Sequence, residues 1–240
     1  MQRRNLEAYA LAAAAFVCAV VTAVDDVLSE NLRWAVVLGG IALLVYRLTL
    51  PPERLDRDAV RPADRLSFEG EPLSQLFGKA KDVRIYAPTG VNLLSAQNCQ
   101  MLWNGLLAKR GGSLQVIVLD PEAAEGLRLA EAQLDGSEEH QVQGLREGLA
   151  GTLGRLERMR DPDRVAYRLL GFNPGFSLVL IDPRTRHGRV IVEFHGVRNE
   201  SIVARMHLEL TKEAHPRWFA YWFRQFERLW ELARTPDQPV

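Results

Sequence analysis

Cysteine is scarce in this sequence. The chain has two cysteines, Cys18 and Cys99, which lie far apart and in unlike surroundings. Neither a CxxC nor an HxxxH spacing occurs, so a disulfide framework and a zinc site are both disfavoured, and we expect no metal and no cofactor. Such sparing use of cysteine is typical of a protein whose soluble part lies in a reducing compartment.

The chain also has no excess of charge of either sign. It carries 30 basic and 30 acidic side chains, and its formal net charge is zero. Because DNA-binding proteins usually have a basic patch or stripe, the overall charge does not favour DNA binding. A phosphate-binding glycine loop is missing as well, since Gly111 and Gly112 precede a β-rich segment, whereas a P-loop follows a strand and opens a helix.

Two apolar segments lie near the N-terminus. Leu6–Val24 has one charged residue, Glu7, and Trp34–Leu50 has one, Arg47. Each segment is close to the ~20 residues that a helix needs to cross a bilayer core. We therefore expect a transmembrane helical hairpin in residues 1–50. A hairpin buried in a soluble core and a cleaved signal peptide are the alternatives, and the second apolar segment argues against a signal peptide.

The arginines predict the orientation of this hairpin. Several precede the first segment or end and follow the second, whereas the loop between the segments has only Arg33. Positively charged flanks stay on the cytoplasmic side, so both termini and the soluble domain are expected in the cytoplasm, at the inner (cell) membrane. The flanking arginines are Arg3, Arg4, Arg47, Arg54, Arg57, Arg61 and Arg65.

One α/β domain is expected after the hairpin. Residues 51–65 are rich in proline and charge and indicate a linker, and residues 66–240 are the predicted cytoplasmic domain. Short β-rich segments first alternate with helical ones, then three β-rich segments follow in succession. This order predicts an α/β fold with a mixed sheet. The β-rich segments are Val83–Pro88, Leu114–Pro121, Val165–Leu170, Phe176–Pro183 and Gly188–Gly196.

A long amphipathic helix is predicted close to the C-terminus, over Glu213–Arg234. One aromatic stripe recurs at i, i+4, i+7 and i+11, the spacing of a core-facing surface. It consists of Phe219, Phe223, Phe226 and Trp230. Other aromatic side chains lie off this stripe, and they could cover the flank of the domain, meet another protomer or contact the membrane surface. These are Trp218, Tyr221 and Trp222.

From Val83 onward the order of elements resembles one half of a phospholipase D superfamily protein. Phe176–Gly196 resembles the catalytic hairpin of that family, and Arg217–Trp230 is similar to its closing helix. The resemblance implies a sandwich of helices around a mixed sheet. It also implies that two copies of the domain meet as a homodimer or higher homo-oligomer.

The motif of that family is H-x-K-x-x-x-x-D, in which the histidine is nucleophile or acid and the lysine holds phosphate. Aligned on this motif, Asp182 and the later Gly188 match, but the histidine and lysine positions are Gly175 and Ser177. Glycine cannot be a nucleophile, and serine carries no positive charge for a phosphoryl oxygen. The standard catalytic residues are therefore absent, and Asp182 is most simply a turn residue that accepts hydrogen bonds from local backbone amides.

Strand alternation groups the remaining polar residues of the hairpin. Val190, Val192 and Phe194 should face one way, and Ile191, Glu193 and His195, together with Arg189, the other. Burying a carboxylate and an imidazole is costly unless both are paired. Glu193 and His195 therefore either satisfy each other and nearby backbone or line a pocket.

Further polar residues extend this candidate site. Arg205 and His207 are two residues apart, so in a strand they would face the same side. Arg168 lies in a β-rich segment that would bring it towards Glu193 if its strand neighbours the hairpin. Arginine suits a bidentate grip on phosphate or carboxylate. The same residues could instead form a buried ion network. The predicted ligand-binding set is Arg168, Ser177, Glu193, His195, Arg198, Arg205 and His207.

Three functions are compatible with these features. The first is a membrane-anchored, catalytically degenerate binding module that recognises a nucleotide, another phosphate-bearing ligand or a protein partner, and signals through oligomerisation of the hairpin. Its architecture resembles that of small two-span bacterial immune effectors used in antiviral defence. The second is a membrane-associated phosphodiesterase that uses His195 as nucleophile or base, with Glu193 orienting it. The third is a structural subunit of a membrane complex.

Overall fold

The computed structural model describes Trp34, Leu38 and residues 62–63, 72–135, 144–198 and 205–238. The chain divides into two compact units, Met1–Asp56 and Arg57–Val240. Apart from Trp34 and Leu38, the predicted membrane segments 6–24 and 34–50 lie outside the described residues. Within the described ranges, no helix has both the length and the apolar character that crossing a bilayer demands.

A mixed seven-stranded sheet organises the described part of the second unit. The strand order is β1-β7-β6-β5-β2-β3-β4. Strands β2, β3 and β4 are parallel, and every other neighbouring pair is antiparallel. The prediction of an α/β domain with a mixed sheet is confirmed. The strands are β1 (Pro62–Ala63), β2 (Asp82–Tyr86), β3 (Ser113–Leu119), β4 (Val165–Leu170), β5 (Phe176–Ile181), β6 (Arg189–Phe194) and β7 (His207–Thr211).

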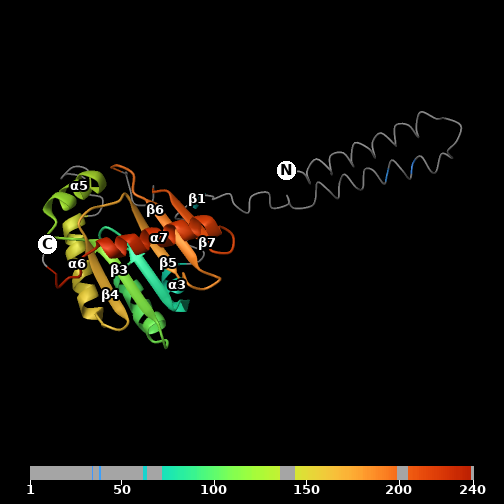
Figure 1. Ribbon diagram of the computed structural model, residues 1–240, viewed down its shortest axis with the longest axis horizontal. Helices are drawn as coiled ribbons and strands as arrows, with labels where there is room; N and C mark the ends of the chain where they lie inside the picture. Colours follow the sequence, from blue (N-terminus) through green and yellow to red (C-terminus); the bar gives the residue numbers. More distant parts are fainter. Residues whose placement is uncertain are drawn as a thin grey trace. The chain divides into compact units, whose positions relative to one another are not determined.

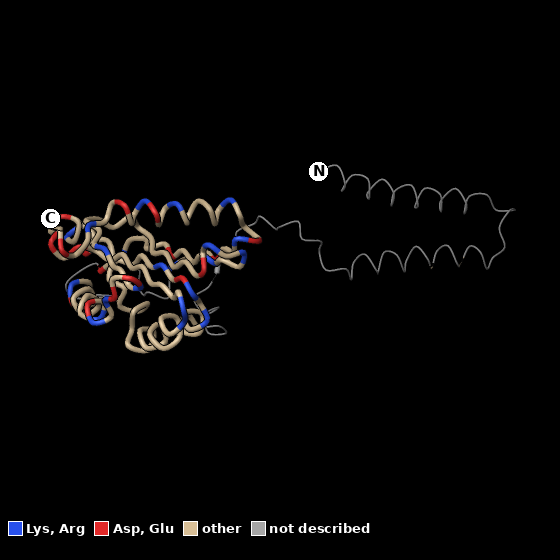
Figure 2. Tube along the Cα trace, turned by 60° about the horizontal axis from the view of Figure 1, so that its bottom comes forward, with Lys and Arg blue, Asp and Glu red and all other residues tan. Residues whose placement is uncertain are grey.

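Helices cover both faces of the sheet, as Figures 1 and 2 show. Among the described helices, α7 (Pro216–Leu232) is the one that lies across one face, where it packs on the apolar residues of β5 and β6. The other helices contribute to a second core on the opposite face. They are α3 (Leu73–Lys79), α4 (Ala96–Met101), the π-helix η2 (Leu102–Leu107), α5 (Ala124–Leu134) and α6 (Leu145–Met159). Central strand β3 is accordingly a nearly continuous apolar run, as expected for a strand covered on both faces.

The edge of the sheet differs from the sequence-based prediction. β1 pairs with β7 at Pro62 and Ala63, inside the segment 51–65 that was predicted to be a linker. Proline is tolerated there because β1 is an edge strand, where a missing N–H donor costs little. The first strand of the sheet thus lies beside β7, and β7 was not among the β-rich segments predicted from the sequence.

The aromatic stripe of α7 is confirmed, with one correction. Phe219 and Phe226 are buried, and Phe223 and Trp230 pack against the same core. Trp222 was predicted to lie off the stripe, where it could cover the flank of the domain, meet another protomer or contact the membrane; its ring packs against the core, edge-on to Phe176 at 5.1 Å and Phe194 at 6.1 Å between centroids. The other two off-stripe residues, Trp218 and Tyr221, are 44% and 42% exposed.

Candidate functional site

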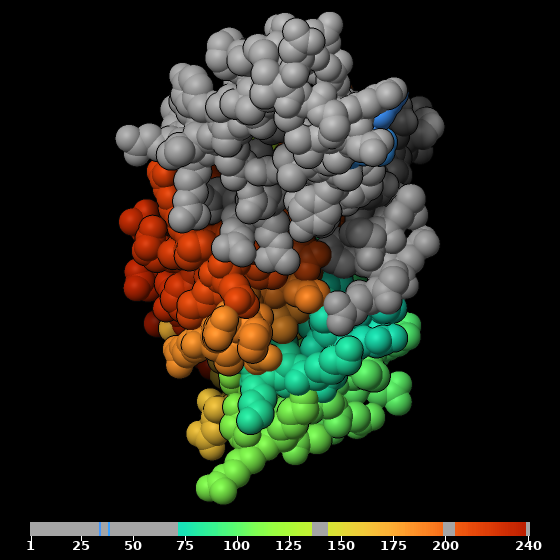
Figure 3. Space-filling view, turned by 90° about the vertical axis from the view of Figure 1, so that its right-hand side faces the viewer, coloured from blue at the N-terminus to red at the C-terminus, as the bar shows by residue number. Residues whose placement is uncertain are grey.

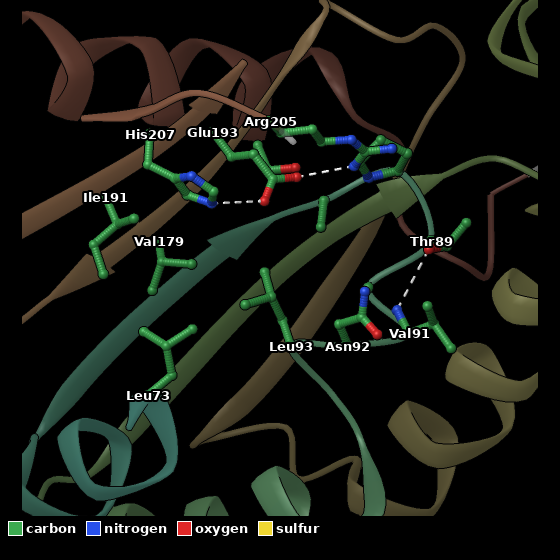
Figure 4. A pocket seen from close by; sticks show the side chains of 14 residues that line it. Leu73, Thr89, Val91, Asn92, Leu93, Val179, Ile191, Glu193, Arg205 and His207 are labelled. Atoms are coloured by element: carbon green, nitrogen blue, oxygen red, sulfur yellow. Dashed lines mark hydrogen bonds and ion pairs between the residues drawn. The ribbon is translucent and has the colours of Figure 1, made fainter. Parts of the chain in front are cut away.

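A cavity of about 70 Å³ lies between the ends of three antiparallel strands and the loop that follows β2. Its polar wall comes from β5, β6, β7 and the residue Arg205, and the loop closes the other side (Figure 4). Ligand sites of α/β proteins commonly lie in such crevices beyond the carboxyl ends of parallel strands. The polar lining residues are Thr89, Asn92, Ser177, Glu193, Arg205 and His207, and the apolar ones include Leu73, Leu93, Val179 and Ile191.

Glu193 is the centre of the polar wall. Its Oε1 accepts a hydrogen bond from Nη1 of Arg205 at 2.9 Å, and its Oε2 lies 3.0 Å from Nε2 of His207. Register explains the arrangement, since Glu193 on β6 stands opposite His207 on β7 and Ser177 on β5. The alternation predicted for β6 is confirmed, because Val190 and Val192 join the core under α7 and Ile191 joins the opposite core.

The pKa of Glu193 shows that this carboxylate stays ionised. Burial alone would raise the pKa, but the hydrogen bonds from His207 and Arg205, together with the charge of Arg205, lower it to about 2. The side chains of Arg205 and Glu193 are only 4% and 17% exposed. The wall of the cavity is therefore a buried ion pair.

Ser177 and His195 form a second contact beside the ion pair. The Oγ of Ser177 lies 2.7 Å from Nε2 of His195, whose side chain is fully buried. Burial and the neighbouring charge of Arg205 lower the pKa of His195 to about 4, against a smaller opposing effect of Glu193. The imidazole is therefore neutral at pH 7 and is a weak base.

The depressed pKa of His195 predicts a loss of stability on mild acidification. In the unfolded chain this histidine titrates near its ordinary pKa of 6.5, whereas the folded value is about 4. Between these values the unfolded state binds more protons, so stability present above pH 6.5 is lost as the pH falls towards 4. The loss is about 3 kcal/mol. Urea denaturation at a series of pH values measures it, and His195→Gln, which cannot protonate, should flatten this part of the profile.

Arg168 does not belong to the site. The expected approach to Glu193 is wrong because β4 and β6 lie on opposite sides of β5, β2 and β3. Nη1 of Arg168 instead donates to the carbonyl oxygen of Trp230 at 2.6 Å, and its guanidinium stacks on the Trp230 ring at 4.7 Å. Arg168 thus satisfies a carbonyl group at the end of α7, a common need of helix C-termini.

Of the other residues predicted to bind a ligand, some line the cavity and some do not. Ser177, Glu193, Arg205 and His207 line the cavity, and His195 lies behind it in contact with Ser177. Arg198 is exposed and is not a lining residue, and its backbone N–H donates to the carbonyl oxygen of Gln133 at 2.9 Å. Whether the lining residues bind a ligand stays a prediction.

The motif positions of the hairpin have structural roles. Gly175 has a φ of +87°, which a residue with a side chain rarely adopts. The turn predicted at Asp182 is confirmed, but its Oδ1 accepts hydrogen bonds from the amides of Lys81 at 2.7 Å and Asp82 at 2.9 Å, at the start of β2. Asp182 follows the end of β5 and Ser177 lies near its beginning, so about 16 Å of strand separates them.

Sequence reasoning missed one wall of the cavity. The loop after β2 contributes a run of lining residues from Ala87 to Leu93. Gly90 in this loop has a φ of +66°, and the N–H of Val91 lies 3.4 Å from Oγ1 of Thr89. A glycine and small polar residues directly after a buried parallel strand were the signal that could have revealed this wall.

Comparisons with known proteins find only distant similarity to this chain. No protein-family model and no curated protein matches it. Seven chains of solved structures match, and two of them are described here. One is TrmBL2, an archaeal chromatin protein that shows a novel mode of DNA binding, at 12% identity and a TM-score of 0.41 over 86% of this chain and 64% of that one. The other is Nuc from Salmonella typhimurium, a phospholipase D family member, at 11% identity and a TM-score of 0.40 over 75% of this chain and 99% of that one.

These likenesses concern the fold alone. The chain spans less than two thirds of the length of TrmBL2. Nuc belongs to the family that the sequence resembles, but the identity of 11% and the TM-score of 0.40 leave its site and activity without bearing on this chain.

Proposed function

We propose that this protein is a membrane-anchored module that binds a small polar ligand in the Glu193 cavity and does not hydrolyse it. The observation that carries the proposal is the ionised Glu193, held by Arg205 and His207 in the wall of a cavity. Buried charges are costly, and a core of the same volume can be built from apolar residues at no loss of stability. An ion pair that faces a cavity is therefore better explained by recognition than by folding.

The cavity suits a ligand with two kinds of polar group. The Glu193 carboxylate can accept hydrogen bonds only, and Arg205 can donate only, although its guanidinium has enough N–H groups to hold Glu193 and a ligand together. The ligand should thus offer N–H or O–H groups to Glu193 and an anionic or carbonyl oxygen to Arg205. Apolar side chains such as Val179 and Ile191 complete the lining, as in most small-molecule sites.

Nucleotides and other phosphate-bearing molecules with hydroxyl or amine groups combine these features. A buried water needs about 10–15 Å³ of such space, so a cavity of about 70 Å³ holds a group the size of a phosphate or several waters. The rest of a larger ligand would extend along the loop at Thr89 and Asn92.

The phosphodiesterase alternative has less support. His195, its nucleophile or base, is fully buried and does not line the cavity, and Nε2 of its ring contacts Ser177. A pKa of about 4 also leaves it a poor base at neutral pH. The positions of the family's histidine and lysine are Gly175 and Ser177, which supply neither a nucleophile of that kind nor a positive charge.

The proposed signal is a change in the association of the membrane hairpins. Small residues in the apolar segments, Gly39 and Gly40 in one and Ala12–Ala15 in the other, allow close helix contacts within or between protomers. A ligand that binds one arrangement of the domains more tightly would shift the protomers towards that arrangement.

Ligand binding should raise the thermal stability of the full-length chain in detergent. A ligand that binds only the folded state at a hundredfold excess over its Kd adds about 2.7 kcal/mol, which corresponds to about 5–10 °C in Tm. The panel comprises nucleotides, cyclic nucleotides and phospholipid headgroups. Arg205→Gln should abolish the shift, because it removes the charged donor from the cavity wall.

Arg168→Gln is the matched control for this experiment. It also removes one positive charge, but from β4 and from the face of the sheet that α7 covers, so the ligand-induced shift should persist. A shift that survives Arg205→Gln, or one lost equally in both variants, would contradict binding at the Glu193 cavity. No shift with any compound of the panel would favour a protein partner.

A further inference from the structure

The exposed face of α7 is a second candidate for an interaction surface. Arg217, Tyr221, Arg224 and Arg228 recur at i, i+4, i+7 and i+11, which places them on one stripe opposite the buried Phe226. All four are exposed, and the adjoining Trp218 is 44% exposed. The Arg217 guanidinium lies 5.6 Å from the Trp218 ring. We call Arg217, Trp218, Tyr221, Arg224 and Arg228 the α7 outer face.

The α7 outer face carries a net positive charge. Within the described ranges, no carboxylate is in salt-bridge contact with Arg217, Arg224 or Arg228. Of the two acidic residues on the helix, Glu227 is paired with Arg84 and Glu231 lies close to the C-terminal end. Figure 2 shows basic positions along α7, with the acidic ones towards the C-terminal end. The chain as a whole is neutral, so this face departs from its average.

The apolar face of α7 is buried in the protein core, so its exposed face could contact a bilayer only through arginine side chains and interfacial aromatic rings. The cations attract the headgroups, and the amphipathic rings settle at the interface. Trp218 and Tyr221 pack edge to face at 6.3 Å between centroids, so the two partly exposed rings form one aromatic patch beside Arg217.

The entry point of the chain favours the same partner. β7 pairs with β1 at Pro62 and Ala63, and α7 begins at Pro216, directly after the turn that follows β7. The N–H of His215, the residue before α7, donates to the carbonyl oxygen of Thr211 at the end of β7. The start of α7 therefore lies close in sequence to the sheet edge that β1 and β7 form, and Figure 3 views the domain from the side of this edge.

We propose that the α7 outer face docks on an anionic lipid surface and thereby sets the orientation of the domain on the membrane. The proposal rests on the membrane anchoring contained in the proposed function. Residues 51–61 can span at most roughly 36 Å when fully extended, so the domain remains close to the bilayer that holds the predicted hairpin. At such a distance three arginines and two aromatic rings suffice for docking without a high intrinsic affinity.

Docking can be measured on the full-length chain in lipid nanodiscs. Tyr221→Cys, with Cys18 and Cys99 replaced by serine, carries an environment-sensitive fluorophore whose emission rises in lipid. The emission should be high in an equimolar mixture of phosphatidylcholine and phosphatidylglycerol, and low in phosphatidylcholine alone. Raising the salt concentration should reduce it, since surface charges are then screened. The same label at Arg158→Cys on α6 should respond to neither lipid.

Neutralising the α7 arginines should release the domain. Each of Arg217→Gln, Arg224→Gln and Arg228→Gln should lower the ratio of docked to undocked domain on the order of fivefold, and the three together about a hundredfold. The matched control neutralises three exposed arginines elsewhere in the domain, Arg110, Arg158 and Arg184, and should leave the emission high.

Three outcomes would overturn the docking proposal. Equal emission in neutral and anionic discs would exclude an anionic lipid as the partner. An equal loss in the control variant would assign the effect to overall charge. A response to an added oligonucleotide in phosphatidylcholine discs, without a response to anionic lipid, would assign the face to nucleic acid. A chain that leaves the discs in high salt would instead contradict the membrane anchoring, and the cavity experiment above remains independent of both.

Discussion

Replacing Arg205 with alanine is expected to lower the free energy of unfolding by about 3–5 kcal/mol. The substitution leaves Glu193 buried and ionised without its guanidinium partner, and such a charge costs far more than the lost hydrogen bond. The side chain of Arg205 is 4% exposed, so solvent does little to weaken this interaction. Urea denaturation at pH 7 measures the change.

An ion pair between β6 and β7 provides the control. Arg189 and Glu209 are 3.1 Å apart, with side chains 29% and 31% exposed. Solvent screens such a pair, so Arg189→Ala should cost at most about 1 kcal/mol. If both arginine variants cost the same, burial of the Glu193 pair is not the source of the effect.

The double variant Arg205→Ala with Glu193→Gln separates two contributions to the lost stability, the unpaired charge of Glu193 and the lost packing of Arg205. A neutral amide needs no guanidinium partner, so the double variant should recover much of the stability that Arg205→Ala removes. In the single variant, the pKa of Glu193 should also rise from about 2 because two of its stabilising influences are gone. Acidification to below the ordinary pKa of glutamate should then cost the variant less stability than it costs the wild type.

Which residues surround Glu193 in the cavity wall could be predicted from the sequence only in part. The period of two along β6 places Glu193 and His195 on the face of Ile191, and this required no structure. The pairing of Glu193 with His207 depends on the register of β6 and β7 across a connection of a dozen residues. Neither parity nor propensity fixes a register of that kind, because a shift by two residues preserves every face.

Arg168 shows why strand order was beyond the sequence. β4 and β5 are consecutive and separated by a short connection, and consecutive strands are neighbours roughly two thirds of the time. Here the chain instead crosses from one edge of the parallel strands to the other side of β2. The parity of Arg168 is also that of Leu170, which lies in the core under α7, so its face as well as its strand excludes the cavity.

The buried face of α7 could be predicted more readily, because the spacing of its aromatic residues is a local pattern. The 3.6-residue period identified the stripe of Phe219 and Phe226, and both are buried. Trp222 was missed since the ends of β5 and β6, with Phe176 and Phe194, reach beyond the width of that stripe. A helical period predicts the centre of a buried face well, but its width is set by the elements beneath it.

Placing a lysine at position 177, where the motif of the resembled family has one, is expected to destabilise the domain and to create no phosphodiesterase activity. Ser177 is 7% exposed and its hydroxyl group lies 2.7 Å from His195. A lysine there must either bury an ammonium group or displace the packed residues around it. Glu193 stands opposite in the register but is already held by Arg205 and His207. The cost should be on the order of 3–5 kcal/mol.

The matched control is Ser177→Ala, which leaves the volume small and removes only the contact with His195, at a cost of about 1–2 kcal/mol. Adding Gly175→His completes the H-x-K-x-x-x-x-D sequence but adds backbone strain, since Gly175 has a φ of +87°. Activity is assayed with bis(p-nitrophenyl) phosphate. A stable Ser177→Lys variant that gains turnover with Gly175→His would show that the hairpin still presents a catalytic geometry. A destabilised and inactive one would show that the packing around Ser177 and the Glu193 ion pair does not accommodate the lysine of that motif.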